Sequence, residues 1–331
     1  MRRRTVCQMR RVFQAFLFGM VAVLIVTLSI HRAIAESPAA GYEKVSGKPA
    51  AFAPAESCKD CHEDIWNAFE KTKHGNAKDP RAPASKEGCQ TCHGPMAEHV
   101  DAGGGKETVN RRFGKDSPLT ANEKSAVCLQ CHEKGNQALW EGSVHQGKGL
   151  ACMNCHAVHG GNPKFLKFAV VHENCFQCHK DKKSEVMNRP SHHPIKEGKM
   201  SCNACHNPHG SPTKHLIAAN STNELCYQCH TEKRGPFLFE HRPVTENCAI
   251  CHTPHGSNHL KLLKEKLPFL CQSCHSVTGH PSTPYVTRST GGPFDNTYEG
   301  LGNLHALYRG CINCHSNIHG SNHPAGQRLL R

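Results

Sequence analysis

The chain has 331 residues, of which 37% are hydrophobic and 6% aromatic, while 21 are Cys and 27 are His. This composition excludes the ordinary apolar core of a globular domain of this length, so another group must fill the interior. The formal net charge of +13 would suit a nucleic-acid partner, but much of that charge lies at the N-terminus.

The first 35 residues have the features of an export signal. Five Arg between positions 2 and 11 precede an apolar run over residues 13–30, and Ala-Ile-Ala at 33–35 offers a small-residue cleavage site. We predict a cleavable signal peptide over residues 1–35; a retained membrane-anchoring helix is the alternative. Cleavage removes six Arg, no acidic residue and Cys7, which lowers the net charge from +13 to +7 and leaves 20 Cys.

The rest of the chain has no sustained helical or strand periodicity. Residues 36–57 are rich in Ala, Pro and Gly and are expected to form a flexible leader. Short helices are predicted at the cysteine motifs, over residues 122–133 and near 221–231, and surface loops at 103–105 and 289–302. The expected fold is therefore mostly irregular, with short α-helices and little or no β-structure.

Ten Cys-x-x-Cys-His motifs account for every Cys after residue 35. This is the signature of c-type haem attachment, because two thiols three positions apart add to the vinyl groups of one haem and the adjacent imidazole reaches the iron. Zinc knuckles and thiol redox centres also use Cys-x-x-Cys, but neither needs a His after every pair or ten copies. The predicted attachment residues are Cys58, Cys61, Cys89, Cys92, Cys128, Cys131, Cys152, Cys155, Cys175, Cys178, Cys202, Cys205, Cys226, Cys229, Cys248, Cys251, Cys271, Cys274, Cys311 and Cys314. The predicted proximal iron ligands are His62, His93, His132, His156, His179, His206, His230, His252, His275 and His315.

The sixth ligand of each iron decides whether such a chain conducts or catalyses. The remaining His are placed periodically and predict five two-haem repeats, each with a motif, a separate His, a second motif and a trailing His. Residues 58–99 form a looser first copy. In the other four copies the second motif is closely followed by a His-Gly segment: Ala157-Val158-His159-Gly160, Asn207-Pro208-His209-Gly210, Thr253-Pro254-His255-Gly256 and Asn317-Ile318-His319-Gly320.

From this pattern we predict ten distal ligands. They are His74, His99, His145, His159, His193, His209, His241, His255, His280 and His319. His192 is an alternative to His193, and His305 is an alternative to His280. The surplus His172, His215, His259 and His323 are expected at the surface or beside haem propionates.

Imidazole on both faces saturates the iron and leaves no position for a substrate, which favours an electron carrier over an enzyme. About thirty residues per haem are too few to enclose each cofactor separately, so the haems must pack together, with Trp66, Trp140 and the Phe side chains against porphyrin faces. Each haem adds a net charge of about −1, so ten haems change +7 to roughly −3. The basic residues are then propionate partners, and nucleic-acid binding is excluded.

The chain resembles the MtrA/DmsE family of periplasmic decahaem cytochromes over residues 58–331. The resemblance lies in motif number and spacing, in Gly94-Pro95 with His99, and in His193-Pro194. It is carried further by Glu232-Lys233-Arg234-Gly235-Pro236 with His241, Pro243-Val244-Thr245-Glu246-Asn247-Cys248, Thr253-Pro254-His255-Gly256-Ser257 and His319-Gly320-Ser321-Asn322-His323-Pro324. The family pattern favours His280 over His305 and lacks His172, His215, His259 and His305.

This resemblance implies an elongated haem chain in two pentahaem halves, residues 58–185 and 186–331, although the five repeats would place that boundary inside the third copy. It implies a periplasmic protein at the outer membrane, inserted into a β-barrel porin of the MtrB type. Its redox partners would be periplasmic or inner-membrane cytochromes and an extracellular multihaem cytochrome or surface reductase.

The function expected from the resemblance is a relay between the periplasm and the cell exterior, for metal reduction, iron oxidation or other extracellular electron transfer. A soluble periplasmic shuttle is the alternative. A multihaem nitrite-type reductase is disfavoured, because the sequence has no Cys-x-x-Cys-Lys motif and holds enough His to fill every iron.

Overall fold

The computed structural model describes residues 50–160, 171–275 and 310–330. The chain divides into two compact units, one formed by Met1–Cys61 with Lys86–Arg111 and the other by His62–Ser85 with Arg112–Arg331. The expected signal peptide, most of the leader, the loop at 289–302, and both His280 and His305 lie outside the described residues. The division into two pentahaem halves stays a prediction.

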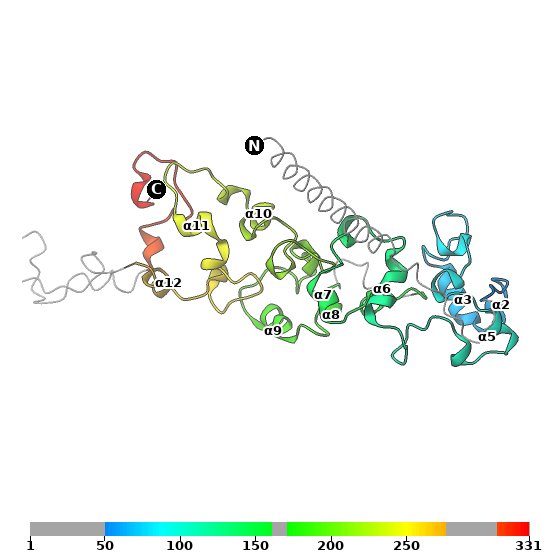
Figure 1. The fold of residues 1–331 in the computed structure, drawn as a ribbon. Coiled ribbons are helices and arrows are strands. Elements are labelled where there is room, and N and C mark those ends of the chain that lie inside the picture. The colour runs from blue at the N-terminus through cyan, green and yellow to red at the C-terminus, as the bar shows by residue number, and fades with distance from the viewer. Residues whose placement is uncertain (1–49, 161–170, 276–309, 331) are drawn as a thin grey trace, which may run out of the picture. The chain divides into compact units, whose positions relative to one another are not determined.

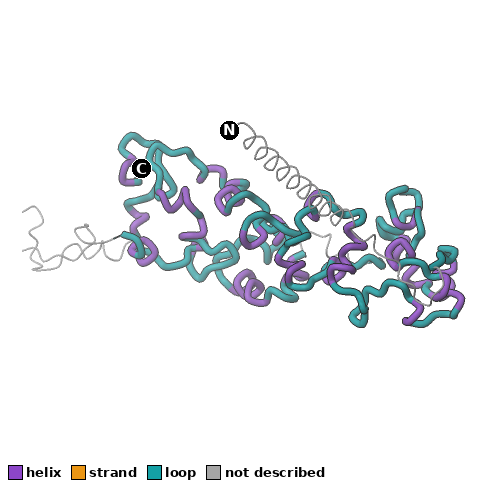
Figure 2. Tube along the Cα trace, viewed as in Figure 1, coloured by secondary structure: helices purple, strands orange, loops and turns teal. Residues whose placement is uncertain are grey.

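Across the described residues, short helices are joined by loops and there is no strand (Figures 1 and 2). This confirms the predicted fold class. The α-helices are α2 Ser57–Cys61, α3 Glu63–Glu70, α4 Gln90–His93, α5 Ala97–Asp101, α6 Ala121–Leu129, α7 Val144–Gly147, α8 His172–Cys175, α9 Lys180–Asn188, α10 Thr222–Tyr227, α11 Arg242–Glu246 and α12 Phe269–Gln272. The 3-10 turns are η1 Pro83–Ser85, η2 Lys106–Thr108, η3 Gly135–Gln137, η4 Cys152–Asn154, η7 Cys202–Ala204, η8 Lys214–Leu216, η9 Thr231–Lys233, η10 Cys248–Ile250, η11 Leu260–Leu262, η12 Cys311–Asn313 and η13 Gly326–Arg328.

Local sequence explains where the two best-predicted helices begin. At α6 the Thr120 hydroxyl accepts a hydrogen bond from Glu123 N, and the Glu123 carboxylate accepts one from Thr120 N, which forms a capping box. At α10 the Ser221 hydroxyl accepts a hydrogen bond from Glu224 N. Both helices end inside a Cys-x-x-Cys-His motif, so each cap fixes the start of a segment that presents thiols.

In the first unit, Gln90 ties the chain before α2 to α4. Its side chain is 1% exposed. Its Oε1 accepts hydrogen bonds from Ala53 N and Met96 N, while its Nε2 donates to Ala53 O. Ala53 lies within the segment expected to be a flexible leader, and the Gln90 side chain holds it through both its backbone N–H and its backbone carbonyl.

Apolar packing in the second unit is sparse. Among the described residues, a buried cluster consists of Phe176, Val186 and Ile195, with Met187 and Met200 packed against it. Such a cluster is far smaller than the core of a domain of this length, as the composition predicts. No described helix is long and apolar enough to span a bilayer.

Candidate functional site

The Cys-x-x-Cys-His motifs share one local geometry. In nine of them the backbone N–H of the His donates to the carbonyl of the first Cys, at 2.8–3.1 Å, which closes a single helical turn. First motifs of the repeats lie at the ends of α-helices such as α6 and α10, whereas second motifs from Cys152 onward form the 3-10 turns η4, η7, η10 and η12. Closing the turn places both thiols and the imidazole on one side of the backbone, as attachment to a single haem requires.

The first thiols of the two motifs in each repeat lie together. The pKa of the Cys89 thiol is lowered to about 7 chiefly by a hydrogen bond with Cys58, and that of Cys152 to about 6 chiefly by one with Cys128. The other pairs in contact are Cys175 with Cys202, Cys226 with Cys248, and Cys271 with Cys311. With a haem attached at each predicted motif, these sulfurs would be thioethers and their contact would mark where two haems approach each other.

The second thiols link one repeat to the next. Burial raises the pKa of Cys155, and the nearby thiols of Cys175 and Cys178 add to that effect. Cys205 has the same relation to Cys226 and Cys229, and Cys251 to Cys274. From Cys128 to Cys314 the attachment points therefore follow one another in sequence order, alternately through first and second thiols.

Seven proximal His rings each face a predicted distal His ring. The ring centroids are separated by 5.8 Å for His74 and His132, 6.3 Å for His145 and His179, 6.0 Å for His156 and His209, 6.5 Å for His193 and His230, 6.0 Å for His206 and His255, 6.1 Å for His241 and His275, and 6.3 Å for His252 and His319. Two imidazoles bound to opposite sides of one metal ion, with metal–nitrogen bonds of about 2 Å, have ring centres roughly 6 Å apart. The spacing thus leaves room for one iron between each pair.

Each pair joins two different repeats. The separate His of one repeat faces the first motif of the following repeat, as His145 faces His179. The trailing His faces the second motif of the preceding repeat, as His255 faces His206. Distal imidazoles are therefore exchanged in both directions along the chain, an arrangement that the repeat pattern did not predict. All ten distal ligands stay predictions, including those of His62, His93 and His315, which lie outside these seven pairs.

The structure separates His193 from its alternative, His192. Both ring nitrogens of His192 are engaged, Nδ1 with Arg189 O at 2.9 Å and Nε2 with Glu197 Oε1 at 3.0 Å. The ring of His193 instead faces His230. Among the surplus residues, His215 and His323 are exposed, whereas His172 is only 9% exposed and its ring lies 5.4 Å from that of Phe176.

Backbone carbonyls hold the proximal rings of several second motifs. His93 Nδ1 donates to Arg111 O at 3.0 Å, and His206, His252 and His315 donate in the same way to His215 O, Lys261 O and Arg328 O, at 2.7–2.8 Å. A carbonyl can only accept, so the proton is on Nδ1 and the Nε2 lone pair is available to a metal.

Two of these carbonyls belong to left-handed turns. The φ angles of His215 and Leu216 are 61° and 56°, and those of Lys261 and Leu262 are 59° and 56°. Consecutive non-Gly residues in this region are strained by about 1–3 kcal/mol each, and such strain is typical of functional sites. Sequence reasoning missed these turns; the available signal was the recurrence of Lys and Leu at 214–216 and 260–262, after the motifs at Cys202 and Cys248.

Distal rings are held in a related way. His145 Nδ1 donates to Pro208 O and His193 Nδ1 to Pro254 O, both at 2.7 Å. Each acceptor directly precedes a trailing His of the following repeat. Burial lowers the pKa of His241, and the Ile318 carbonyl, which has the same place beside this ring, partly opposes that lowering at a geometry short of a full hydrogen bond. One tail therefore orients two distal rings, its own and that of the neighbouring repeat.

Burial favours the neutral form of several predicted ligand imidazoles. It is the main cause of a lowered pKa for His74, His156, His159, His209, His241 and His255, and it lowers the pKa of His319 to about 4. The neutral ring is the form that binds a metal. The site is thus prepared for ligation at pH 7.

Close backbone contacts fix the trailing His-Gly segments. A Cβ atom at Gly160 would lie 2.5 Å from Ala68 Cβ, one at Gly210 1.9 Å from Leu139 O, and one at Gly256 2.3 Å from Glu185 O. Gly320 is similarly close to Phe237. Only Gly permits this approach, so the His before it is placed by the close packing of its glycine neighbour.

Buried polar atoms also fit a haem. The indole Nε1 of Trp66, that of Trp140 and the Oγ of Ser201 are buried and have no hydrogen-bond partner among the described residues. Unpaired buried donors are rare and need an acceptor. A haem propionate is such an acceptor, and the indole ring offers an apolar face to the porphyrin.

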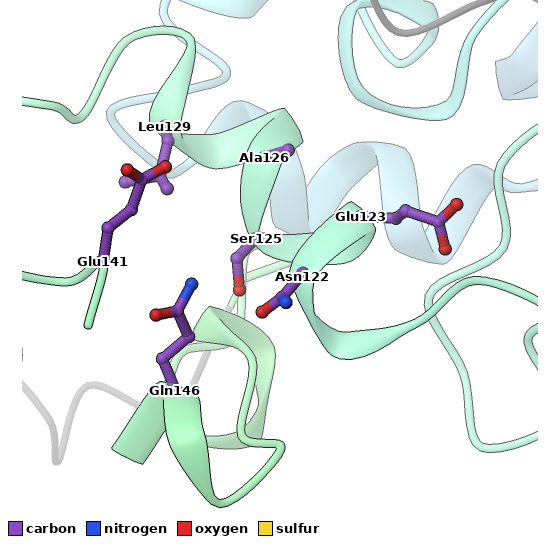
Figure 3. A pocket seen from close by; sticks show the side chains of 7 residues that line it. All are labelled: Asn122, Glu123, Ser125, Ala126, Leu129, Glu141 and Gln146. Atoms are coloured by element: carbon purple, nitrogen blue, oxygen red, sulfur yellow. The ribbon is translucent and has the colours of Figure 1, made fainter. Parts of the chain in front are cut away.

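A cavity of about 410 Å³ lies between α6 and the segment around α7 (Figure 3). Its lining holds no motif Cys or His and consists of Asn122, Glu123, Ser125, Ala126, Leu129, Glu141 and Gln146. Within residues 50–160, 171–275 and 310–330, no group of three His, Cys, Asp or Glu side chains is placed to hold a metal ion directly.

Known proteins share these motifs. Residues 192–235 and 241–280 match the family profile "Doubled CXXCH motif", and residues 89–172 match "Cytochrome c-type protein NrfB-like". The chain is 42% identical to the multiheme cytochrome MtrA of Shewanella baltica over 84% of its own length and 81% of that protein. It is 22% identical to the C-type polyheme cytochrome OmcB of Geobacter sulfurreducens over 65% of its length, which is 28% of that longer protein. These similarities establish covalently bound haem c and a role in electron transfer, and the chain belongs to the MtrA family of multihaem c-type cytochromes.

Proposed function

We propose that the chain binds ten haems, each with two axial His, and relays electrons between the periplasm and the cell exterior as the cytochrome subunit of an outer-membrane porin conduit. The seven facing ring pairs carry this proposal. Their centroid separations of 5.8–6.5 Å suit an iron ligated on both sides. Ten motifs then imply ten haems, with the Cys and His predicted from the sequence as attachment residues and ligands.

Bound haem supplies the group that gains and loses an electron; the chain supplies order and rigidity. Imidazoles on both faces, oriented by carbonyls such as Pro208 O and Lys261 O, change little when the charge of the iron changes. The alternating thiol contacts support a single file of neighbouring haems rather than a branched cluster. No ligand position is left for a substrate, which supports a carrier rather than an enzyme.

Export and an outer-membrane location are proposed from the N-terminal sequence and from membership of the MtrA family. The proposed partners are a β-barrel porin, a periplasmic or inner-membrane cytochrome, and an extracellular multihaem cytochrome or surface reductase. Net charge after haem attachment is close to neutral, which suits a chain enclosed by another protein.

Reconstitution tests the conduit. The full-length gene would be expressed with a neighbouring barrel gene, the purified material inserted into liposomes that contain an electron acceptor, and dithionite added outside. The proposal predicts that barrel and cytochrome purify together and that the internal acceptor is reduced only when both are present. Purification of the cytochrome alone, without electron transfer across the bilayer, would contradict the conduit and favour a soluble shuttle.

A further inference from the structure

The trailing His residues differ in what stands beside them. Each tail packs against one residue of another repeat: Gly160 against Ala68, Gly210 against Leu139, Gly320 against Phe237 and Gly256 against Glu185. Three of these four neighbours are uncharged. Glu185 is the exception at this packing position, whereas the charges that act on the ring of His319 come from Lys233 and Glu232, which do not pack against its tail glycine.

Glu185 contacts the ligand ring itself. Its Oε2 lies 3.6 Å from His255 Nδ1, with the two side chains 26% and 33% exposed. This separation is slightly longer than a hydrogen bond, so the interaction is that of a partly buried charge beside the ring. The position is well fixed, because Gly256 allows the tail to approach the backbone of α9.

Glu185 also forms an ion pair on α9. Its Oε1 accepts a hydrogen bond from Lys182 Nζ at 2.8 Å. Four charged or titratable groups act on His255: Lys182, His206, Glu185 and Asp181. Lys182 disfavours positive charge at the ring and acts more strongly there than Glu185, which favours it. Asp181 is 69% exposed and paired with Lys182, so its effect is the most screened.

We propose that the Glu185–Lys182 ion pair sets the reduction potential of the haem attached at Cys202 and Cys205, with Glu185 lowering the potential and Lys182 raising it. This inference rests on the proposed ligation of that iron by His206 and His255. A negative charge beside an axial imidazole increases the basicity of the ligand and stabilises ferric iron, which carries one more positive charge than ferrous iron. A positive charge has the opposite effect. The pair is a tuning element for this haem.

Two variants of the holoprotein separate the two charges. Glu185→Gln keeps the side-chain shape, removes the negative charge and leaves Lys182 unopposed, so it favours reduction of this haem. Lys182→Met leaves the carboxylate unopposed and favours oxidation. We expect shifts of opposite sign, each about a tenfold change in the reduction equilibrium, which is about 59 mV for a one-electron couple.

Glu197→Gln is the matched control. Glu197 accepts a hydrogen bond from His192 Nε2 at 3.0 Å, so this variant also removes a carboxylate from an imidazole, but His192 is not a proposed ligand. Potentiometric titration followed at the α-band of the reduced haems is the measurement. The difference from wild type should have the amplitude of one haem for E185Q and K182M, and be absent for E197Q.

Opposite one-haem shifts confirm the inference. It is overturned if both variants match wild type, if they shift in the same direction, or if E197Q gives the same shift as E185Q. Electron paramagnetic resonance of each oxidised variant distinguishes failure of the tuning inference from failure of the proposed function. Low-spin signals with unshifted potentials reject only the tuning pair, whereas a high-spin haem in the wild-type protein would reject the ligation on which it rests.

Discussion

The ring of His209 lies nearly parallel to the ring of His156, with centroids 6.0 Å apart and an interplanar angle of 13°, although the two residues belong to different repeats. A two-haem repeat is therefore not a closed unit. In each of the seven facing pairs, the proposed iron site has one imidazole from its own motif and the other from a neighbouring repeat, so ligation there would hold successive repeats together.

Removal of one distal ring should affect a haem in the preceding repeat. We expect His209→Ala to free the iron held by His156, which yields one high-spin haem that binds carbon monoxide, while added imidazole restores the low-spin spectrum. His259→Ala, at a surplus His, is the control and should leave the spectrum unchanged.

The double variant H156A/H209A tests the exchange of ligands. If both rings serve one iron, carbon monoxide binds to the equivalent of one haem. Binding to two haems per chain would mean that His209 serves the haem of its own repeat, and the exchange would be wrong.

Gly210 should tolerate no side chain. Its φ is 141°, and a Cβ would lie 1.9 Å from Leu139 O. We expect Gly210→Ala to displace His209 and to lower the thermal unfolding midpoint by roughly 5–10 °C. Gly142→Ala is matched for backbone strain, with φ of 80° and no atom within 4 Å, and should cost about 1 kcal/mol. Equal effects in the two variants would show that close packing at Gly210 is unimportant.

The Asn223 side chain should hold the backbone of the motif at Cys248 in the conformation needed for haem attachment. Its Nδ2 donates to Val244 O and Thr245 O, and its Oδ1 accepts from Cys248 N at 2.7 Å. Asn223→Ala leaves these backbone groups unpaired at a position that is 7% exposed, which costs roughly 2–4 kcal/mol. Intact mass spectrometry should then detect chains that lack one haem. The control variant Asn220→Ala, at an exposed position, should carry the full number of haems. An N223A chain that carries the full number of haems with unchanged stability would refute this role.

Acid should release distal ligands. A His in the unfolded chain has a pKa of about 6.5, whereas burial lowers that of His319 to about 4. Between these values the unfolded chain binds the proton and the folded chain does not, so stability falls as the pH drops from about 6.5 towards about 4. Absorption spectra should show low-spin haem at neutral pH and high-spin haem as the pH approaches about 4. Loss of low-spin haem already above about pH 6 would contradict the protection by burial.

The sequence predicted local features well and long-range pairing poorly. The helices expected over 122–133 and near 221–231 appear as α6 and α10, because their caps and motif turns are encoded within a few residues. The loop at 103–105 is also present, with positive φ at all three Gly. The iron that each distal His faces could not be predicted, since it depends on contacts such as Gly210 with Leu139 between repeats.

The carbonyls that orient the rings also could not be predicted from the sequence. Every residue has a carbonyl, and only the folded turn selects that of Lys261 or Pro208 as the acceptor. The contact between Glu185 and His255 could not be predicted for a similar reason. Glu185 lies in a charged segment whose sequence is typical of a solvent-exposed helix, and tertiary packing brings it to His255.

The central claim is that imidazoles close both faces of every iron, and near-infrared magnetic circular dichroism of the oxidised holoprotein, quantified against total haem content, tests it most directly. Our account predicts ten haems per chain, all low-spin, with the charge-transfer band of His–His ligation. A substantial share of high-spin or His–Met haem would contradict it.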